Sequence, residues 1–151
     1  LGLCFRFGRG VKGDHAQAVL WFRRAAEQRY AAAEFDLGVA YDYGWGVRRD
    51  HREAFAWYRK AAEQGHASAQ NNLGNCYLDG KGVAVDDGRA VAWYRKAAAQ
   101  GEPLALRNLG LCYETGRGVK RSRERAIEWY RKAVARGNEE ARQRLHALGA
   151  R

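Results

Sequence analysis

The sequence predicts an all-α fold: an α/α solenoid, coiled as a right-handed superhelix, of four helix–loop–helix repeats and a C-terminal capping helix. Leu-Gly recurs at a constant step of 36 residues, at Leu1-Gly2, Leu37-Gly38, Leu73-Gly74 and Leu109-Gly110. Trp recurs at the same step, at Trp21, Trp57, Trp93 and Trp129. A fixed period of this length is typical of units stacked in a row, which build a long regular surface in place of one central pocket.

The repeats form a single array, whose boundaries fall at 1–36, 37–72, 73–108 and 109–144. The six residues that precede Leu-Gly in the later repeats are missing before Leu1, so we expect the chain to be part of a longer protein. A last helix is expected over about 139–148. Its outer side is polar, as the exposed end of a solenoid requires.

The first helix of the third repeat is expected over 67–79. Ala69, Leu73 and Tyr77 are spaced by four residues, so they lie on one face of this helix. Gly80 and Gly82 then end it, because glycine adopts positive φ without strain. A Val follows the second glycine of this loop in every repeat, and we expect it to fill the space between the two helices.

The second helix of each repeat is expected to begin after a side chain that caps helix N-termini well: Asp14, Asp50, Asp86 or Ser122. Gln17 and Glu53 follow three residues after their caps, which predicts a capping box in repeats one and two. The Trp column falls on the Ala-rich face of this helix, so we interpret it as core. A glycine ends the second helix in three repeats; in the first repeat Arg29 takes its place.

The formal net charge is +10, and half of this excess lies in repeat four, which has ten Lys and Arg against five Asp and Glu. Lines of Arg and Lys are also expected along the convex side, from the residues that follow each Trp. Such surfaces attract RNA, anionic membranes or acidic proteins, although a solvated surface is the commoner role of exposed charge. The sequence has no run of about 18 apolar residues, so it predicts no membrane span.

The three cysteines, Cys4, Cys76 and Cys112, occupy one column of the repeat. Equivalent positions in stacked helix pairs are about 10 Å apart, which is too far for a disulfide. We interpret them as buried thiols, which favours a reducing compartment such as the cytoplasm. The four His and two Ser stand in no metal-ligand or nucleophile motif, so we expect no enzyme, no metal and no cofactor.

The pattern LGxCYxxGxGVxxDxxxAxxWYRKAAxQGxxxAxxN closely resembles the Sel-1-like repeat, a relative of the tetratricopeptide repeat, over nearly the whole chain. The resemblance implies an α/α superhelix that acts as a scaffold or adaptor for other proteins. Some cysteine-rich relatives carry a disulfide in each repeat. This chain has Ala62, Ala69, Ala98 and Ala105 where such pairs would stand, so it departs from that group.

The resemblance also implies that the first helices line a concave groove. Residues beside the packed positions, at helical steps of three or four, would then contact a partner. They differ between repeats while their neighbours do not, which is typical of a constant frame with a variable surface. The predicted groove residues are Phe7, Phe35, Val39, Asp42, Tyr43, Asn71, Asn75, Leu78, Asp79, Arg107, Leu111 and Glu114.

These patterns favour a non-catalytic scaffold that binds a peptide or protein in the concave groove. One alternative is a basic surface that binds RNA or an anionic membrane through repeat four and the convex Arg and Lys lines. Another is a structural spacer between flanking domains. Trp45, the one aromatic residue in its loop column, is either an exposed contact residue or folds back over Tyr43 or His51.

Overall fold

The computed structural model describes residues 14–150, and in this part of the chain it has eight α-helices and no strand. The prediction of an all-α fold is therefore confirmed. The helices are α2 His15–Glu27, α3 Ala31–Tyr43, α4 His51–Glu63, α5 Ala67–Asp79, α6 Asp87–Ala99, α7 Pro103–Thr115, α8 Arg123–Val134 and α9 Glu139–Ala147.

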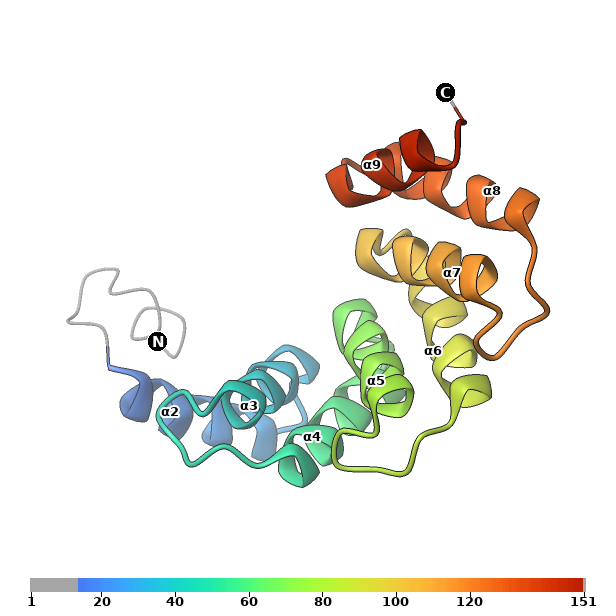
Figure 1. The fold of residues 1–151 in the computed structure, drawn as a ribbon. Coiled ribbons are helices and arrows are strands. Elements are labelled where there is room, and N and C mark those ends of the chain that lie inside the picture. Colours follow the sequence, from blue (N-terminus) through green and yellow to red (C-terminus); the bar gives the residue numbers. More distant parts are fainter. Residues whose placement is uncertain (1–13, 151) are drawn as a thin grey trace.

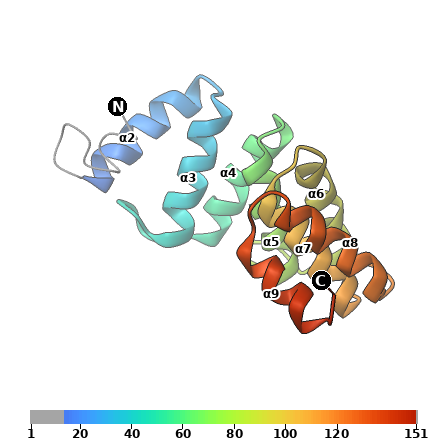
Figure 2. The ribbon, with the colours of Figure 1, turned by 90° about the horizontal axis from the view of Figure 1, so that it is seen from above.

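The helices form an arc in which each helix packs against the next one along the chain (Figure 1). Helices α5, α7 and α9 follow its inner side, and α4, α6 and α8 its outer side. The view from above separates α2 and α3 clearly from the C-terminal helices (Figure 2). We call the first helix of each repeat (α3, α5, α7 and α9) an inner helix, and the second (α2, α4, α6 and α8) an outer helix.

The two helices of a repeat pack most closely at the Leu-Gly dipeptide of the inner helix. Leu73 is fully buried, and Gly74 lies under the ring of Tyr94 from the outer helix. A Cβ atom at Gly74 would lie 2.5 Å from Cε1 of that ring, so only glycine allows this approach. Gly38 and Gly110 meet Tyr58 and Tyr130 in the same way. The dipeptide therefore recurs because a tyrosine ring packs on it in every described repeat.

The glycine loop connects the two helices of one repeat and also packs against the repeat before it. Gly80 ends α5 at φ 71°, and Gly82 has φ 73°. A Cβ atom at Gly82 would lie 2.1 Å from the carbonyl oxygen of His51, in the first turn of the preceding outer helix. Gly46 and Gly118 make the equivalent contacts with His15 and Asp87. Each loop thus rests on the outer helix of the repeat before it.

The predicted N-caps are confirmed, but the predicted capping box of repeat two is wrong. Asp14, Asp50, Asp86 and Ser122 each accept a hydrogen bond from a backbone N–H in the first turn of their helix. In repeat two a capping box needs Glu53 to accept from the N–H of Asp50. That N–H instead donates to the carbonyl oxygen of Tyr41 at 2.9 Å, so the loop satisfies it.

The tyrosines and tryptophans of the outer helices are buried to different depths, which was not predicted. Tyr58, Tyr94 and Tyr130 are no more than 1% exposed, whereas Trp57, Trp93 and Trp129 are half-buried at the edge of the core. The interpretation of the Trp column as core is therefore confirmed only in part: the rings pack against the core but are not enclosed in it. The reason is that the glycine of the inner helix receives the neighbouring tyrosine, so the indole lies at the edge. Lys60, Lys96 and Lys132 cover these rings, with Nζ 3.8, 4.0 and 4.2 Å from the ring centroids.

The last helix of the described residues is α9, which begins at the predicted 139 and ends at 147, one residue before the predicted 148. Its Ala141 and Leu145 are buried against the preceding pair, while Glu139, Arg142 and Arg144 stay exposed. Asn138 caps the helix by accepting from the N–H of Ala141. The apolar face of α8 is thereby covered by a helix whose other side is polar.

Candidate partner-binding face

The inner helices of repeats three and four are joined by a row of asparagines. The Nδ2 atom of Asn108 in α7 donates to Oδ1 of Asn71 at 2.9 Å and to Oδ1 of Asn75 at 3.2 Å, both in α5. Asn71 in turn donates from Nδ2 to Oδ1 of Asn72 at 3.2 Å. Asn71 and Asn108 are 2% and 8% exposed, so these bonds satisfy polar groups that water does not reach.

A second set of contacts links each buried tyrosine to an acceptor on the inner helix. The hydroxyl of Tyr58 donates to Asp42 at 3.4 Å, and that of Tyr130 donates to Glu114 at 2.5 Å. In repeat three Leu78 occupies the equivalent position and offers no acceptor. Tyr94 donates instead to Oδ1 of Asn75, one turn earlier, at 2.7 Å. Burial is the main cause that raises the pKa of all three phenols, so they stay protonated at neutral pH.

Arg107, and again Glu114 and Asp42, also contact ionisable side chains of other elements. Arg107 lies 3.0 Å from Glu140 of α9, and Glu114 lies 3.4 Å from Arg144 of the same helix. Asp42 accepts from Nδ1 of His51 at 2.9 Å. These side chains therefore have structural partners, which makes them part of the frame as well as of its surface.

The structure corrects the prediction at two positions. Val39 is 7% exposed and packs into the main core cluster, and Asn71 is buried in the asparagine row. Neither side chain is available to a partner, because Val39 lies in the core and Asn108 of the next inner helix covers Asn71. Phe7, also predicted for the groove, lies outside the described residues.

The remaining predicted groove residues reach the surface to different degrees. Tyr43 is 62% exposed, and Asp79 is exposed with its carboxylate 3.8 Å from Nζ of Lys81. Phe35 is half-buried and stacks on His66 with ring centroids 4.7 Å apart. Leu104, which shares a helix face with Arg107 and Leu111, is 45% exposed. The other four predicted groove residues are half-buried: Asn75, Leu78, Arg107 and Leu111.

Trp45 lies in the loop after α3, stacked between two rings. Its centroid is 5.0 Å from that of Tyr43 and 5.9 Å from that of His15, and the side chain is 37% exposed. It folds back over Tyr43, one of the two predicted alternatives, although its histidine neighbour is His15 and not His51. In the same column Arg117 pairs with Asp87 at 2.7 Å. Both loop residues hold the first residue of the preceding outer helix.

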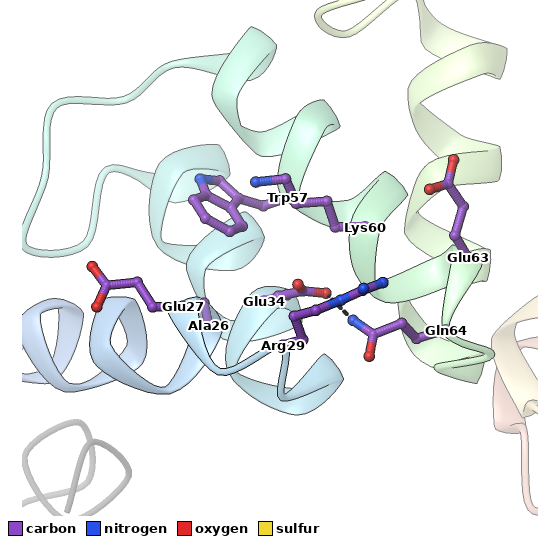
Figure 3. A pocket seen from close by; sticks show the side chains of 8 residues that line it. All are labelled: Ala26, Glu27, Arg29, Glu34, Trp57, Lys60, Glu63 and Gln64. Carbon is purple, nitrogen blue, oxygen red and sulfur yellow. Dashed lines mark hydrogen bonds between the residues drawn. The ribbon is translucent and has the colours of Figure 1, made fainter.

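A depression of about 480 Å³ opens between α2, α3 and α4 (Figure 3). Its buried carboxylate, Glu34, is 3% exposed and accepts from Nε2 of Gln64 at 2.5 Å. One repeat later Gln100 donates to Gln70 at 2.9 Å in the same way, so this contact belongs to the frame. Arg29 lines the depression at φ 60°, where the later repeats have glycine.

Two features of the structure were missed by sequence reasoning. One is the lysine over each tryptophan, which the repeated Trp-Tyr-Arg-Lys run signals, because residues three apart face the same side of a helix. The other is the pairing of arginines with the tyrosines of the inner helices: Arg23 donates to Tyr41, and Arg95 donates to Tyr113 at 3.2 Å. No pattern within one repeat reveals this pairing, because each bond joins an outer helix to the next repeat.

Among residues 14–150, no three His, Cys, Asp or Glu side chains gather in a way that suits a metal ion. No helix in the same range is long and apolar enough to cross a membrane. Cys76 and Cys112 are buried without a disulfide, and burial raises the pKa of their thiols to about 12 and about 11.

Comparison with known families and structures agrees with this architecture. A family model described as Sel1 repeat matches residues 1–30, 31–66, 67–102 and 103–138. The search of curated proteins gave no match. Among solved structures, the chain is similar to a protective antigen present in uropathogenic Escherichia coli strains that displays an SLR fold. The two share 43% identity with a TM-score of 0.92, over 98% of this chain and 32% of that one.

Two further structures are similar. A Sel1 repeat protein from Oxalobacter formigenes is 39% identical with a TM-score of 0.87, over 93% of this chain and 56% of that one. Cysteine rich protein B of Helicobacter pylori is 25% identical with a TM-score of 0.66, over 89% and 96%. The chain thus spans about a third of the Escherichia coli structure and just over half of the Oxalobacter one.

Proposed function

The chain belongs to the Sel1 repeat family, and we propose that it holds a protein partner against the exposed face of its inner helices. Sel1 repeat proteins are generally non-catalytic protein-interaction scaffolds of the tetratricopeptide-like class. A scaffold needs a rigid frame and an exposed surface that differs from one unit to the next. The inner helices of this chain carry both.

One observation carries the proposal: large apolar side chains stay exposed on inner helices whose frame positions are filled. Tyr43 and Leu104 are 62% and 45% exposed, although the tyrosine and asparagine contacts beside them are complete. Aromatic and aliphatic side chains of this kind are common energetic centres of interfaces. Leu78 of α5 and Leu111 of α7 add half-buried apolar side chains to the inner helices.

The charge of this face indicates the chemistry of the partner. Asp79 is exposed, and Asp42 and Glu114 are half-buried, on a protein whose net charge is +10. Carboxylates here oppose a nucleic-acid backbone. They suit an amphipathic helix or extended segment that presents apolar side chains beside Lys or Arg.

The test is affinity capture with the intact chain, read by quantitative mass spectrometry. We expect the variant Tyr43→Ser with Leu104→Ser to lose the proteins that the wild type captures. Its matched control is Leu20→Ser with Val85→Ser, which removes two side chains that are 52% and 60% exposed but lie off the inner helices. For a purified captured protein, the first variant should weaken binding about tenfold or more. Equal losses in both variants would contradict the proposal.

A further inference from the structure

Two arginines converge on one phenol where the third and fourth repeats meet. Arg95 of α6 and Arg125 of α8 both donate to Oη of Tyr113 in α7, at 3.2 and 3.5 Å. The Arg125 guanidinium carbon also lies 5.5 Å from the ring centroid. Two like charges on one neutral oxygen repel each other. The hydrogen bond from Arg95 is the main cause that lowers the pKa of Tyr113, so negative charge is favoured at this spot.

The loop before α8 adds two more cations. Lys120 and Arg121 are exposed and, with Ser122, Glu124 and Arg125, line an open depression of about 350 Å³. Neither Lys120 nor Arg121 forms an ion pair with any residue from 14 to 150. Glu124 is the one carboxylate of the lining, and it accepts from the Ser122 hydroxyl at 3.0 Å. We call Arg95, Lys120, Arg121 and Arg125 the repeat-four basic cluster.

Repeat three shows how such an arginine is normally neutralised. Its Arg89, equivalent to Arg125, lies 3.2 Å from the carboxylate of the N-cap residue Asp86. Repeat four has Ser122 at the position of Asp86, so Arg125 lacks this partner. The loop of repeat three also has no cation at the two preceding positions, which are Ala84 and Val85. Repeat four therefore gains cations and loses a carboxylate at the same place.

Repeat two is an intermediate case. Arg48 and Arg49 stand where repeat four has Lys120 and Arg121, beside a similar depression of about 500 Å³. Repeat two keeps its N-cap carboxylate, Asp50, and has Glu53 at the position of Arg125. Its positive charge is thus opposed by two carboxylates of its own. Among the described repeats, repeat four alone has two loop cations opposed by a single carboxylate, that of Glu124.

We propose that the repeat-four basic cluster docks an acidic segment of a protein partner, rich in Asp and Glu, on a surface separate from the inner-helix face. Guanidinium groups bind carboxylates through paired N–H donors. Here Arg125 of α8 and the loop residues Lys120 and Arg121 line an open depression, and Arg95 of α6 shares the hydroxyl of Tyr113 with Arg125. A single-stranded nucleic acid would also need exposed aromatic faces for its bases. The ring of Tyr113 is buried at 5% exposure, and Lys132 covers Trp129.

The test uses a fluorescein-labelled hexaglutamate peptide and its hexaglutamine counterpart, with binding to the intact chain measured by fluorescence anisotropy. We expect the glutamate peptide alone to bind. The key variant is Ser122→Asp, which supplies the carboxylate that Asp86 provides in repeat three. Because Asp caps helices as well as Ser does, the helix is retained, and thermal unfolding verifies this. The variant should weaken peptide binding about tenfold, because Arg125 then has an internal partner.

The matched control is Gln17→Glu, which adds the same charge to the first turn of α2, far from the cluster. Its affinity should stay within about twofold of the wild type, since the added charge is screened over that distance. The second variant, Lys120→Gln with Arg121→Gln, should also weaken peptide binding about tenfold or more, because it removes two of the four cations. Equal weakening by Gln17→Glu, binding of hexaglutamine, or failure of the glutamate peptide to bind would overturn the proposal.

An oligouridine RNA provides the competing class of ligand. If it bound more tightly than the peptide, with the same sensitivity to Ser122→Asp, the cluster would be a nucleic-acid site and the proposal would fail. The Tyr43→Ser, Leu104→Ser variant should bind the peptide normally. The two proposals can therefore fail separately.

Discussion

At the scale of single residues, the buried tyrosines show how one substitution is compensated by another. The hydroxyls of Tyr58 and Tyr130 use a carboxylate on the inner helix, and Leu78 removes that acceptor in repeat three. Asn75 replaces it for Tyr94 and also accepts from Asn108. A buried hydroxyl without a partner costs about 1–3 kcal/mol, which explains why the two changes occur together.

His66 predicts a pH dependence of stability. Its Nδ1 accepts from the N–H of Ala69 at 3.2 Å as the N-cap of α5, and burial lowers its pKa. The folded state therefore resists protonation, and the stability contributed by neutral His66 is present above the ordinary pKa of about 6.5. It is lost as the pH falls from there through the lowered pKa. The loss should be about 1 kcal/mol, the usual value of a capping bond.

The measurement is urea unfolding between pH 7.5 and pH 5, in comparison with His66→Asn. Asparagine caps α9 at the equivalent position, Asn138, and it does not titrate. The free energy of unfolding of the variant should change less with pH than that of the wild type. Identical slopes in the two proteins would rule out His66 as the source of the dependence.

At the scale of elements, the loop glycine Gly82 contacts the neighbouring repeat, whereas the helix glycine Gly88 does not. Gly82 has positive φ, and its Cα faces the backbone of α4. We expect Gly82→Ala to destabilise the protein by at least about 2 kcal/mol through strain and displacement of the loop. Gly88 lies exposed in the first turn of α6, and a Cβ there would meet only the Asp86 carboxylate, at 3.4 Å.

Gly88→Ala is therefore the control, and it should stabilise the protein by about 0.5–1 kcal/mol, because alanine restricts the unfolded chain and favours the helix. Equilibrium denaturation of both variants gives the two changes. Opposite signs are expected. Destabilisation of similar size in both variants would show that the contact of Gly82 with α4 contributes little.

The elements were largely predictable from the sequence, and the depth of their side chains was not. The bounds of α5 were predicted at 67–79 because Gly80 marks its end and the apolar spacing marks its face. That Tyr94 is buried more deeply than Trp93 could not be predicted, because the two are adjacent and both apolar. Only the glycine that receives the Tyr94 ring, on another helix, decides between them.

The candidate site was predictable to a smaller extent, for a similar reason. Asn71 was expected to face a partner, yet it is buried by Asn108, 37 residues away in the next repeat. The pattern within one unit reveals which residues share a face. It does not reveal how much of that face the next unit covers.

At the scale of the whole molecule, residues 14–150 contain one large core cluster and one small one. The small cluster joins α2 to α3, and the large one extends from α3 and α4 to α9. Because each repeat contacts only its neighbours, local opening starts where fewest contacts must break. Amide hydrogen exchange should therefore be slowest in α5, α6 and α7, and faster in α2 and α9.

Exchange followed by mass spectrometry on peptides from each helix measures this order. Variants that weaken the middle of the array, such as Gly74→Ala, should accelerate exchange there first. Uniform protection along the chain would instead mean that it opens in a single cooperative step.

The asparagine row has a mechanical consequence. It fastens α5 to α7, and the pairs of Arg107 and Arg144 fasten α7 to α9. In the preceding unit Phe35 and Val39 stand where Asn71 and Asn75 do, so the amide hydrogen bonds of the row have no counterpart at these positions. Directional bonds resist bending more than apolar contacts, which allow surfaces to slide. We therefore expect the arc to bend more readily at its N-terminal units than at its C-terminal units, which should keep their curvature.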